Sequence, residues 1–172
     1  MIKMMRKGYT LTEVIISIVL MSLIFAISMP VYYRMSTTLP KEAQLVSIAQ
    51  RLLFLLSDAR KLGFLGNNVV CIKYSNRIFE TFVDNDLDGQ PDNNQSISKI
   101  DLTVRDYENI TLTFNGQQVT QISDLYTVDG VFAKKVGNTL DLTYSNATFQ
   151  FSLQGQSIRV VIEDSLPKII EK

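Results

Sequence analysis

The chain opens with one long apolar run. Residues 14–33 are 20 positions without a charged side chain. A helix rises about 1.5 Å per residue, so a helix of this length crosses the ~30 Å hydrocarbon core of a bilayer. The pattern predicts a membrane-spanning helix, which we place at residues 9–34.

A second periodic segment follows the apolar run. Its apolar side chains recur at steps of three and four residues, as on one face of a helix; they are Leu45, Ile48, Ala49, Leu52, Leu53, Leu56, Ala59 and Leu62. We expect an amphipathic helix over residues 35–63. Pro40 disfavours helix at the residue before it, which predicts a break at 37–39 with Thr38 as a cap, and Gly63 is a natural helix stop.

After Gly66 the hydrophobic pattern changes to period two. Seven to nine short segments rich in β-branched and aromatic residues alternate with turn dipeptides such as Asn-Gly and Asp-Gly, a pattern typical of antiparallel strands. We assign them to a β-rich domain over residues 64–166 and expect a frayed tail at 167–172. The predicted fold class is α+β: a long N-terminal helix, half transmembrane and half amphipathic, packed on an antiparallel β-sandwich or two-sheet domain.

Charge gives the span an orientation. Lys3, Arg6 and Lys7 precede it, whereas Arg34 is the only cation just after it. This bias favours a single-pass protein of the cytoplasmic (inner) membrane, with its N-terminus in the cytoplasm and the rest of the chain outside. Without the first eight residues the chain has three more acidic than basic side chains, a balance that argues against a nucleic-acid binder.

The residue inventory lowers the prospect of an enzyme. There is no histidine, which excludes Ser-His-Asp triads and imidazole acid/base chemistry. Cys71 is the single cysteine and lies in a strand-like segment, where a thiol is usually a small core side chain. We expect no catalytic residues and no required cofactor.

Glu13 stands at the head of the apolar run, in "RKGYTLTEVIISIVL". Insertion scales put the cost of such a charge at roughly 2.5–3.5 kcal/mol at the centre of the bilayer, and an intramembrane carboxylate usually marks a function. The alternatives are a glutamate that reaches the lipid headgroups or is protonated, a plain membrane anchor, and an ordinary signal peptide cut near Ala26 or Ser28.

The stretch "KGYTLTEV" resembles the processing site of type IV prepilins and pseudopilins. The matching features are a short basic leader, Gly8 as its last residue, the aromatic Tyr9 and a glutamate, Glu13, fifth after the cut. Pro30 matches a proline that pilins commonly carry 22 residues after the cut. Tyr9 replaces the commoner phenylalanine.

The resemblance implies a set of roles and partners. Residues 1–8 would be a leader that prepilin peptidase removes, and Tyr9 the new, methylated N-terminus. Glu13 would pair with the N-terminal amine of a neighbouring pilin subunit in a filament, and Pro30 would permit local unwinding. The partners are therefore other pilin or pseudopilin subunits, prepilin peptidase and the cytoplasmic membrane.

A looser resemblance concerns the segment from the second helix to the first hairpin. It is similar to the GspH/FimT group, the H-type minor pseudopilins of type II secretion, at Ala59, Arg60, Gly63, Asn68, Val70, Phe82, Asp84, Asp88, Gly89 and Asp92. This implies a minor pseudopilin or pilin of a type II secretion or type IV pilus-like filament. The alternative is a minor pilin at a filament tip that binds DNA, through Lys134, Lys135 and Arg159, or a secreted substrate.

The stretch "DNDLDGQPD" is the one candidate metal site. Asp84, Asp86 and Asp88 alternate, and Asp92 follows; alternating carboxylates with a glycine wrap Ca²⁺ in EF-hand-type loops. At the twelfth position, however, Gln95 stands in place of a bidentate glutamate. The competing interpretation is a solvated acidic turn, which Asp, Asn and Gly favour for local reasons.

Overall fold

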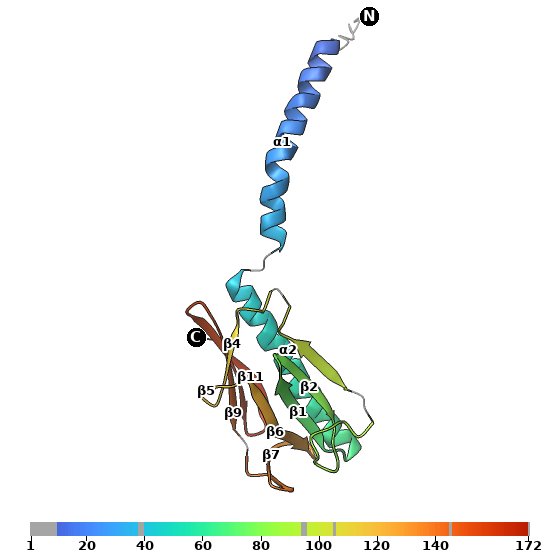
Figure 1. The fold of residues 1–172 in the computed structure, drawn as a ribbon, viewed down its shortest axis with the longest axis vertical. Helices are drawn as coiled ribbons and strands as arrows, with labels where there is room; N and C mark the ends of the chain where they lie inside the picture. Colours follow the sequence, from blue (N-terminus) through green and yellow to red (C-terminus); the bar gives the residue numbers. More distant parts are fainter. Residues whose placement is uncertain (1–9, 38–39, 94–95, 105, 145, 172) are drawn as a thin grey trace, which may run out of the picture. The chain divides into compact units, whose positions relative to one another are not determined.

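The structure is a computed structural model, and it describes residues 10–37, 40–93, 96–104, 106–144 and 146–171. The chain divides into two units, residues 1–39 and 40–172, and each is described by itself. The sequence-predicted α+β, pilin-like layout is confirmed (Figure 1).

The first unit contains helix α1, Leu11–Thr37. Its segment Leu11–Pro30 is long and apolar enough to cross a membrane, and none of this segment is buried within the protein. The helix extends three residues beyond the predicted end at residue 34. Thr38, the expected cap, lies outside the described residues.

The second unit begins with helix α2, Lys41–Gly66. The helix does not stop at Gly63 as the sequence suggested; Asn67, with a left-handed φ of 47°, follows its last residue. Gly63 is instead buried where helix and sheet meet, and a Cβ there would lie 3.0 Å from Thr127 Oγ1 and 3.2 Å from Thr127 O. The glycine therefore permits a close helix–strand approach.

The described residues form eleven strands in two antiparallel sheets. Sheet A has the order β3-β2-β1-β6-β7-β8, and its strands, in chain order, are β1 Val70–Ser75, β2 Ile78–Val83, β3 Ser98–Asp101, β6 Gln121–Val128, β7 Val131–Val136 and β8 Thr139–Asp141. Sheet B has the order β11-β10-β9-β4-β5, and its strands are β4 Thr111–Phe114, β5 Gln117–Gln118, β9 Ala147–Leu153, β10 Gln156–Glu163 and β11 Leu166–Glu171.

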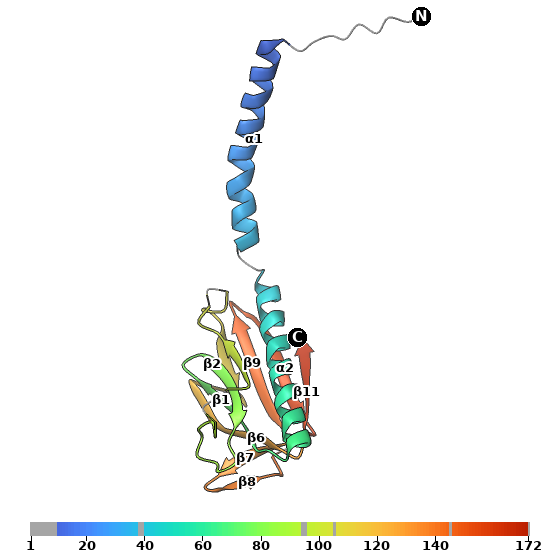
Figure 2. The ribbon, with the colours of Figure 1, turned by 90° about the vertical axis from the view of Figure 1, so that its right-hand side faces the viewer.

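The C-terminal segment corrects the sequence analysis. Residues 167–172 were expected to form a frayed tail, but β11 pairs with β10 from Leu166 opposite Glu163 to Glu171 opposite Ile158. The strand lies beside α2 (Figure 2). Pairing satisfies the backbone groups of this segment, so it forms an edge of sheet B rather than a free end.

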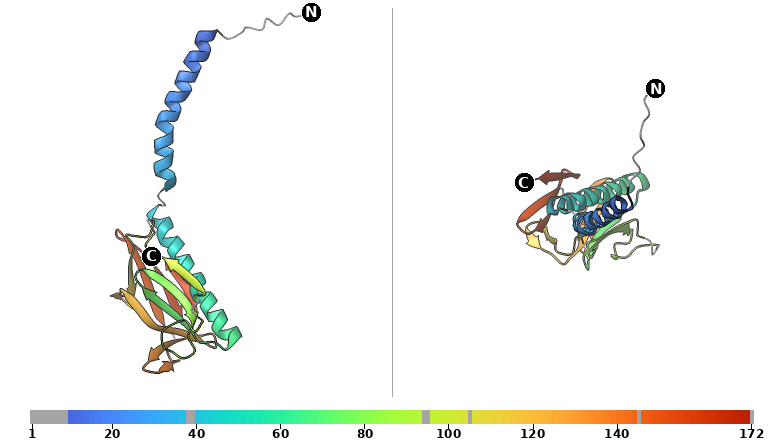
Figure 3. Two further views of the ribbon diagram at one scale, coloured as in Figure 1. Left: turned by 45° about the vertical axis from the view of Figure 1, so that its right-hand side comes forward. Right: turned by 90° about the horizontal axis from the view of Figure 1, so that it is seen from above.

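Helix α2 contacts strands of both sheets and covers one side of the core between them (Figure 3). Its apolar face is almost fully buried: Leu45, Ile48, Ala49, Leu52, Leu55, Leu56 and Ala59 are at most 3% exposed. The predicted helical stripe thus becomes the helical wall of the main core. The other walls are inward-facing side chains of the two sheets, among them Phe79, Phe132, Phe149 and Phe151.

Five hairpins turn through two residues that both have left-handed φ values; the pairs are 76–77, 115–116, 129–130, 154–155 and 164–165. Such turns match the twist of the flanking strands and usually take Asn-Gly or Asp-Gly. Arg77 and Ser165 occupy positions where glycine is common, with φ near 63° and 62°. Both are anchored by side-chain hydrogen bonds, Ser165 Oγ accepting from Phe132 N–H.

Arg77 links the β1–β2 hairpin to the connection between β3 and β4. Its guanidinium donates to the carbonyl oxygens of Leu102, Tyr107 and Ile110 at 2.8–3.4 Å. One planar group with several donors can serve all three acceptors, which a lysine cannot do.

Replacing Arg77 by alanine is expected to lower the free energy of unfolding by about 2–3 kcal/mol, because three carbonyl oxygens lose a charged donor. Arg159→Ala is the matched control, since the Arg159 side chain makes no hydrogen bond or ion pair in the described part of the chain; it should change stability by less than about 0.5 kcal/mol. Urea unfolding of the full-length protein in detergent measures both. Equal effects of the two variants would show that the hydrogen bonds of Arg77 do not stabilise the fold.

Candidate functional site

Glu13 takes part in a capping box at the start of α1. The Thr10 N–H and the Thr10 hydroxyl both donate to Glu13 Oε2, at 2.9 and 3.0 Å, and the Glu13 N–H donates to Thr10 Oγ1 at 3.3 Å. This is the reciprocal arrangement of the Thr-x-x-Glu motif, which satisfies donors that the first helical turn leaves open. The signal "TLTE" was present in the sequence but was not interpreted in this way.

Only one of the two oxygens of the Glu13 carboxylate accepts hydrogen bonds among the described residues. Both Thr10 donors go to Oε2, and within the described residues Oε1 has no hydrogen-bond partner. A carboxylate offers about four acceptor sites. Glu13 can therefore cap its own helix and still accept a hydrogen bond from another molecule.

Of the other residues predicted to act in this segment, only Pro30 is described by the structure. Gly8 and Tyr9, the two sides of the expected cut, lie outside the described residues. Pro30 lies inside α1, which continues through it to Thr37. Proline has no N–H, so the Ala26 carbonyl lacks the helical donor it would otherwise have.

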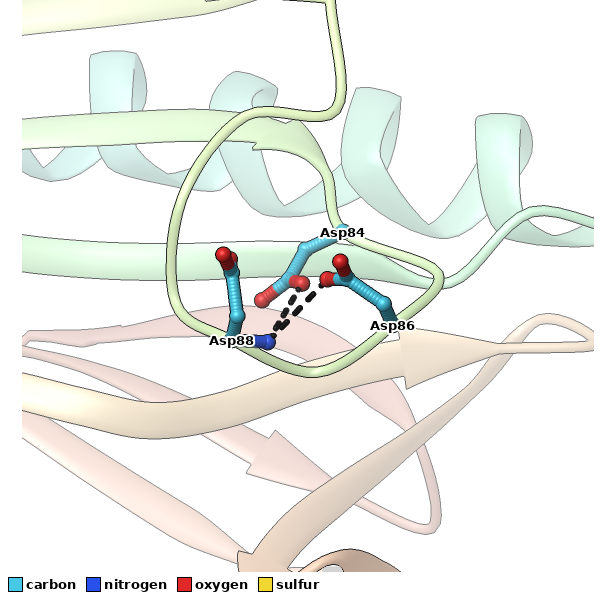
Figure 4. A group of neighbouring side chains, drawn as sticks. All are labelled: Asp84, Asp86 and Asp88. Atoms are coloured by element: carbon cyan, nitrogen blue, oxygen red, sulfur yellow. Dashed lines mark hydrogen bonds between the residues drawn. The ribbon is translucent and has the colours of Figure 1, made fainter.

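The structure brings Asp84, Asp86 and Asp88 together (Figure 4). One carboxylate oxygen from each lies within 4.8 Å of the others, a spacing that oxygen ligands 2.3–2.6 Å from one Ca²⁺ can have. Asp92 is not in this group; its Oδ2 accepts the backbone and side-chain N–H groups of Asn85 at 3.1 and 2.9 Å. Gln95 lies outside the described residues, and a calcium site here stays a prediction.

Asp84 is not a solvated turn residue. It is 0% exposed, and its carboxylate accepts the N–H groups of Asp88 (3.0 Å) and Gly89 (2.9 Å) and the Tyr126 hydroxyl (2.9 Å). The sequence gave no sign of this burial, because Tyr126 is 42 residues away along the chain. A buried carboxylate needs such donors to offset its lost hydration.

Asp86 lies at the surface of the same loop. The Asp88 N–H bound to its carboxylate lowers the pKa of Asp86, but contact with Asp84, some loss of solvent and the negative charges of Asp88 and Asp92 outweigh this, and the pKa is raised overall. The carboxylates of this loop thus repel one another.

The cations considered for DNA binding belong to different sheets. Lys134 and Lys135 are on β7 of sheet A, and Arg159 is on β10 of sheet B. Lys134 lies 3.5 Å from an Asp124 carboxylate oxygen, and Lys135 donates to the Leu87 carbonyl. DNA binding remains an alternative without a specific observation in its favour.

Cys71 lies fully buried beside Tyr126 and Asp84. Burial raises the pKa of the thiol to about 12; a hydrogen bond with Tyr126 opposes this rise, and the negative charge of Asp84 adds to it. The pKa of Tyr126 is also raised, first by burial. Both groups are therefore held in their neutral forms.

Stability should fall at alkaline pH. The unfolded thiol ionises near pH 9 and the folded one near pH 12, so between these values the folded state binds more protons and unfolding becomes easier by up to about 1.4 kcal/mol per pH unit. Urea unfolding at pH 8, 9 and 10.5 tests this, with Cys71→Ala as the comparison. A fall equally steep in Cys71→Ala would show that the thiol is not responsible.

Comparison with known proteins gives one match. Residues 3–29 match the family model of the prokaryotic N-terminal methylation motif. No curated protein and no solved structure matches the chain. The matched segment contains the basic residues, the glycine, the glutamate and most of the apolar run that the sequence analysis singled out.

The motif is the type IV pilin-like prepilin signal, and together with the apolar helix α1 it fits a membrane-anchored protein and a structural subunit rather than an enzyme. The chain carries the signal of a type IV pilin-like protein, a class whose members are processed by prepilin peptidase and assemble with other pilin subunits.

Proposed function

We propose that this protein is a minor subunit of a type IV pilus-like filament, most like the GspH/FimT-type minor pseudopilins of type II secretion. The observation that carries the proposal is Glu13: a carboxylate at the head of an unburied, membrane-length helix, with one oxygen bound to Thr10 and the other unused among the described residues. The basic N-terminal flank supports a cytoplasmic N-terminus and an exported second unit.

Cleavage after Gly8 would release an amine one residue before the cap. In a filament, the Glu13 Oε1 of one subunit accepts from the Tyr9 amine of its neighbour while Oε2 still caps its own helix. In hydrocarbon, either charged group is costly to leave without the other. Subunits are thus favoured to insert at the depth where amine and carboxylate meet.

The apolar surface of α1 supplies the remaining contacts. Its side chains between Val14 and Met29 are exposed in the single subunit, so they face lipid before assembly and neighbouring helices afterwards. The hydroxyl groups of Ser17 and Ser22 donate to carbonyl oxygens of their own helix. They therefore leave no unsatisfied hydroxyl donor on this apolar surface. The missing bond at Pro30 permits local unwinding as the helix leaves the bilayer.

Intact-mass measurement of the membrane-extracted protein tests the processing step. We expect a chain that begins at a methylated Tyr9, because the resemblance to prepilins makes Gly8 the last residue of the leader. A chain that retains residues 1–8, or one cut near Ala26, would contradict the proposal.

Two substitutions separate the charge of Glu13 from its capping role. Glu13→Gln keeps an oxygen that can accept from Thr10, as glutamine does in capping boxes, but removes the charge; Glu13→Ala removes both. We expect either variant to lower incorporation into filaments at least about tenfold, the effect of truncating one partner of a desolvated charge pair. Immunoblots of sheared filaments against the membrane pool measure this.

Glu108→Gln is the control, since Glu108 is an exposed glutamate of the exported unit and should assemble normally. If Glu13→Gln assembles as well as the unaltered protein, the carboxylate serves only as a helix cap and the registry role is wrong.

A further inference from the structure

The outer face of sheet A carries a second, small core. Cys71, Phe82, Tyr126 and Ala133 form it, on the side of the sheet away from the main core, and all are at most 1% exposed. The acidic loop, residues 84–92, passes over this face (Figure 4), and its Leu87 packs against this cluster together with Val69 and Leu140. The loop is therefore a lid on apolar side chains that would otherwise meet water.

Both carboxylate oxygens of Asp84, at the base of this lid, accept hydrogen bonds. Asp84 Oδ1 accepts from Asp88 N–H, and Asp84 Oδ2 accepts from Gly89 N–H and the Tyr126 hydroxyl. Two of these donors are backbone groups of the loop itself, so their hydrogens point at the carboxylate that would be the central Ca²⁺ ligand. Three donors thus stabilise the buried carboxylate without a metal ion.

Two lysines hold the lid from the sheet below. Lys73 Nζ donates to the Gly89 carbonyl at 3.1 Å, and Lys135 Nζ donates to the Leu87 carbonyl. They project from β1 and β7, the strands on either side of β6, which carries Tyr126. Both are half-buried, and each brings a positive charge to a loop that holds four carboxylates.

We propose that Lys73 and Lys135 are the internal cations of this loop, and that they hold it closed over the second core without a metal ion. Each ammonium group donates to a main-chain carbonyl of the loop, and each adds a positive charge beside a segment that holds four carboxylates. The loop folds without calcium, whatever filament the protein serves.

The test is thermal unfolding of full-length protein in detergent, followed by near-ultraviolet circular dichroism, with chelator or with millimolar CaCl₂. We expect the same Tm in both conditions for the unaltered protein. Lys73→Met and Lys135→Met should each lower Tm by about 3–8 °C, because a carbonyl loses a charged donor.

Lys134→Met is the matched control. It removes the same charge from the neighbouring position on β7, but Lys134 interacts with Asp124 and Tyr144 rather than with the loop, so its Tm should fall by less than about 2 °C. A Tm of the unaltered protein that rises and saturates with calcium, and that loses this response in Asp86→Asn, would overturn the proposal. The proposal would also be overturned if Lys73→Met and Lys135→Met were no less stable than Lys134→Met.

Discussion

The second unit, residues 40–172, depends on the burial of one face of α2. The helix contacts strands of both sheets, and its core residues Ile48, Leu52 and Leu56 are completely shielded from water. Side chains of both sheets share one core with this face, so helix and sheets bury their apolar surfaces together. The close contact at Gly63 fixes how near the helix can lie to β6.

Glu13 and Asp84 are stabilised by the same kinds of hydrogen bond. Glu13 and Asp84 both accept hydrogen bonds from main-chain N–H groups a few residues away and from one hydroxyl group. They differ in what remains. Asp84 is enclosed by its own domain and has a structural role. One oxygen of Glu13 has no hydrogen-bond partner among the described residues, which makes Glu13 the candidate for assembly.

The features that could be predicted from the sequence are those that depend on the local pattern of apolar and polar residues. The three- and four-residue spacing from Leu45 onward gave α2, and strict alternation in β9 gave a strand with one buried face. Gly63 was misjudged because its role is a tertiary contact with Thr127, and β11 was missed because its pairing with β10 follows an Asp-Ser turn. The Thr10–Glu13 cap was readable from spacing alone, but the burial of Asp84 was not, since it depends on the distant Tyr126.

The tight two-residue turns limit where this protein can acquire new specificity. Five of its hairpins leave no slack in the connection, so an insertion there would disturb strand twist directly. The connections from β2 to β3 and from β3 to β4 are longer. Altered recognition is therefore easier to obtain in these two connections and on the exposed faces of the strands than at the five tight turns.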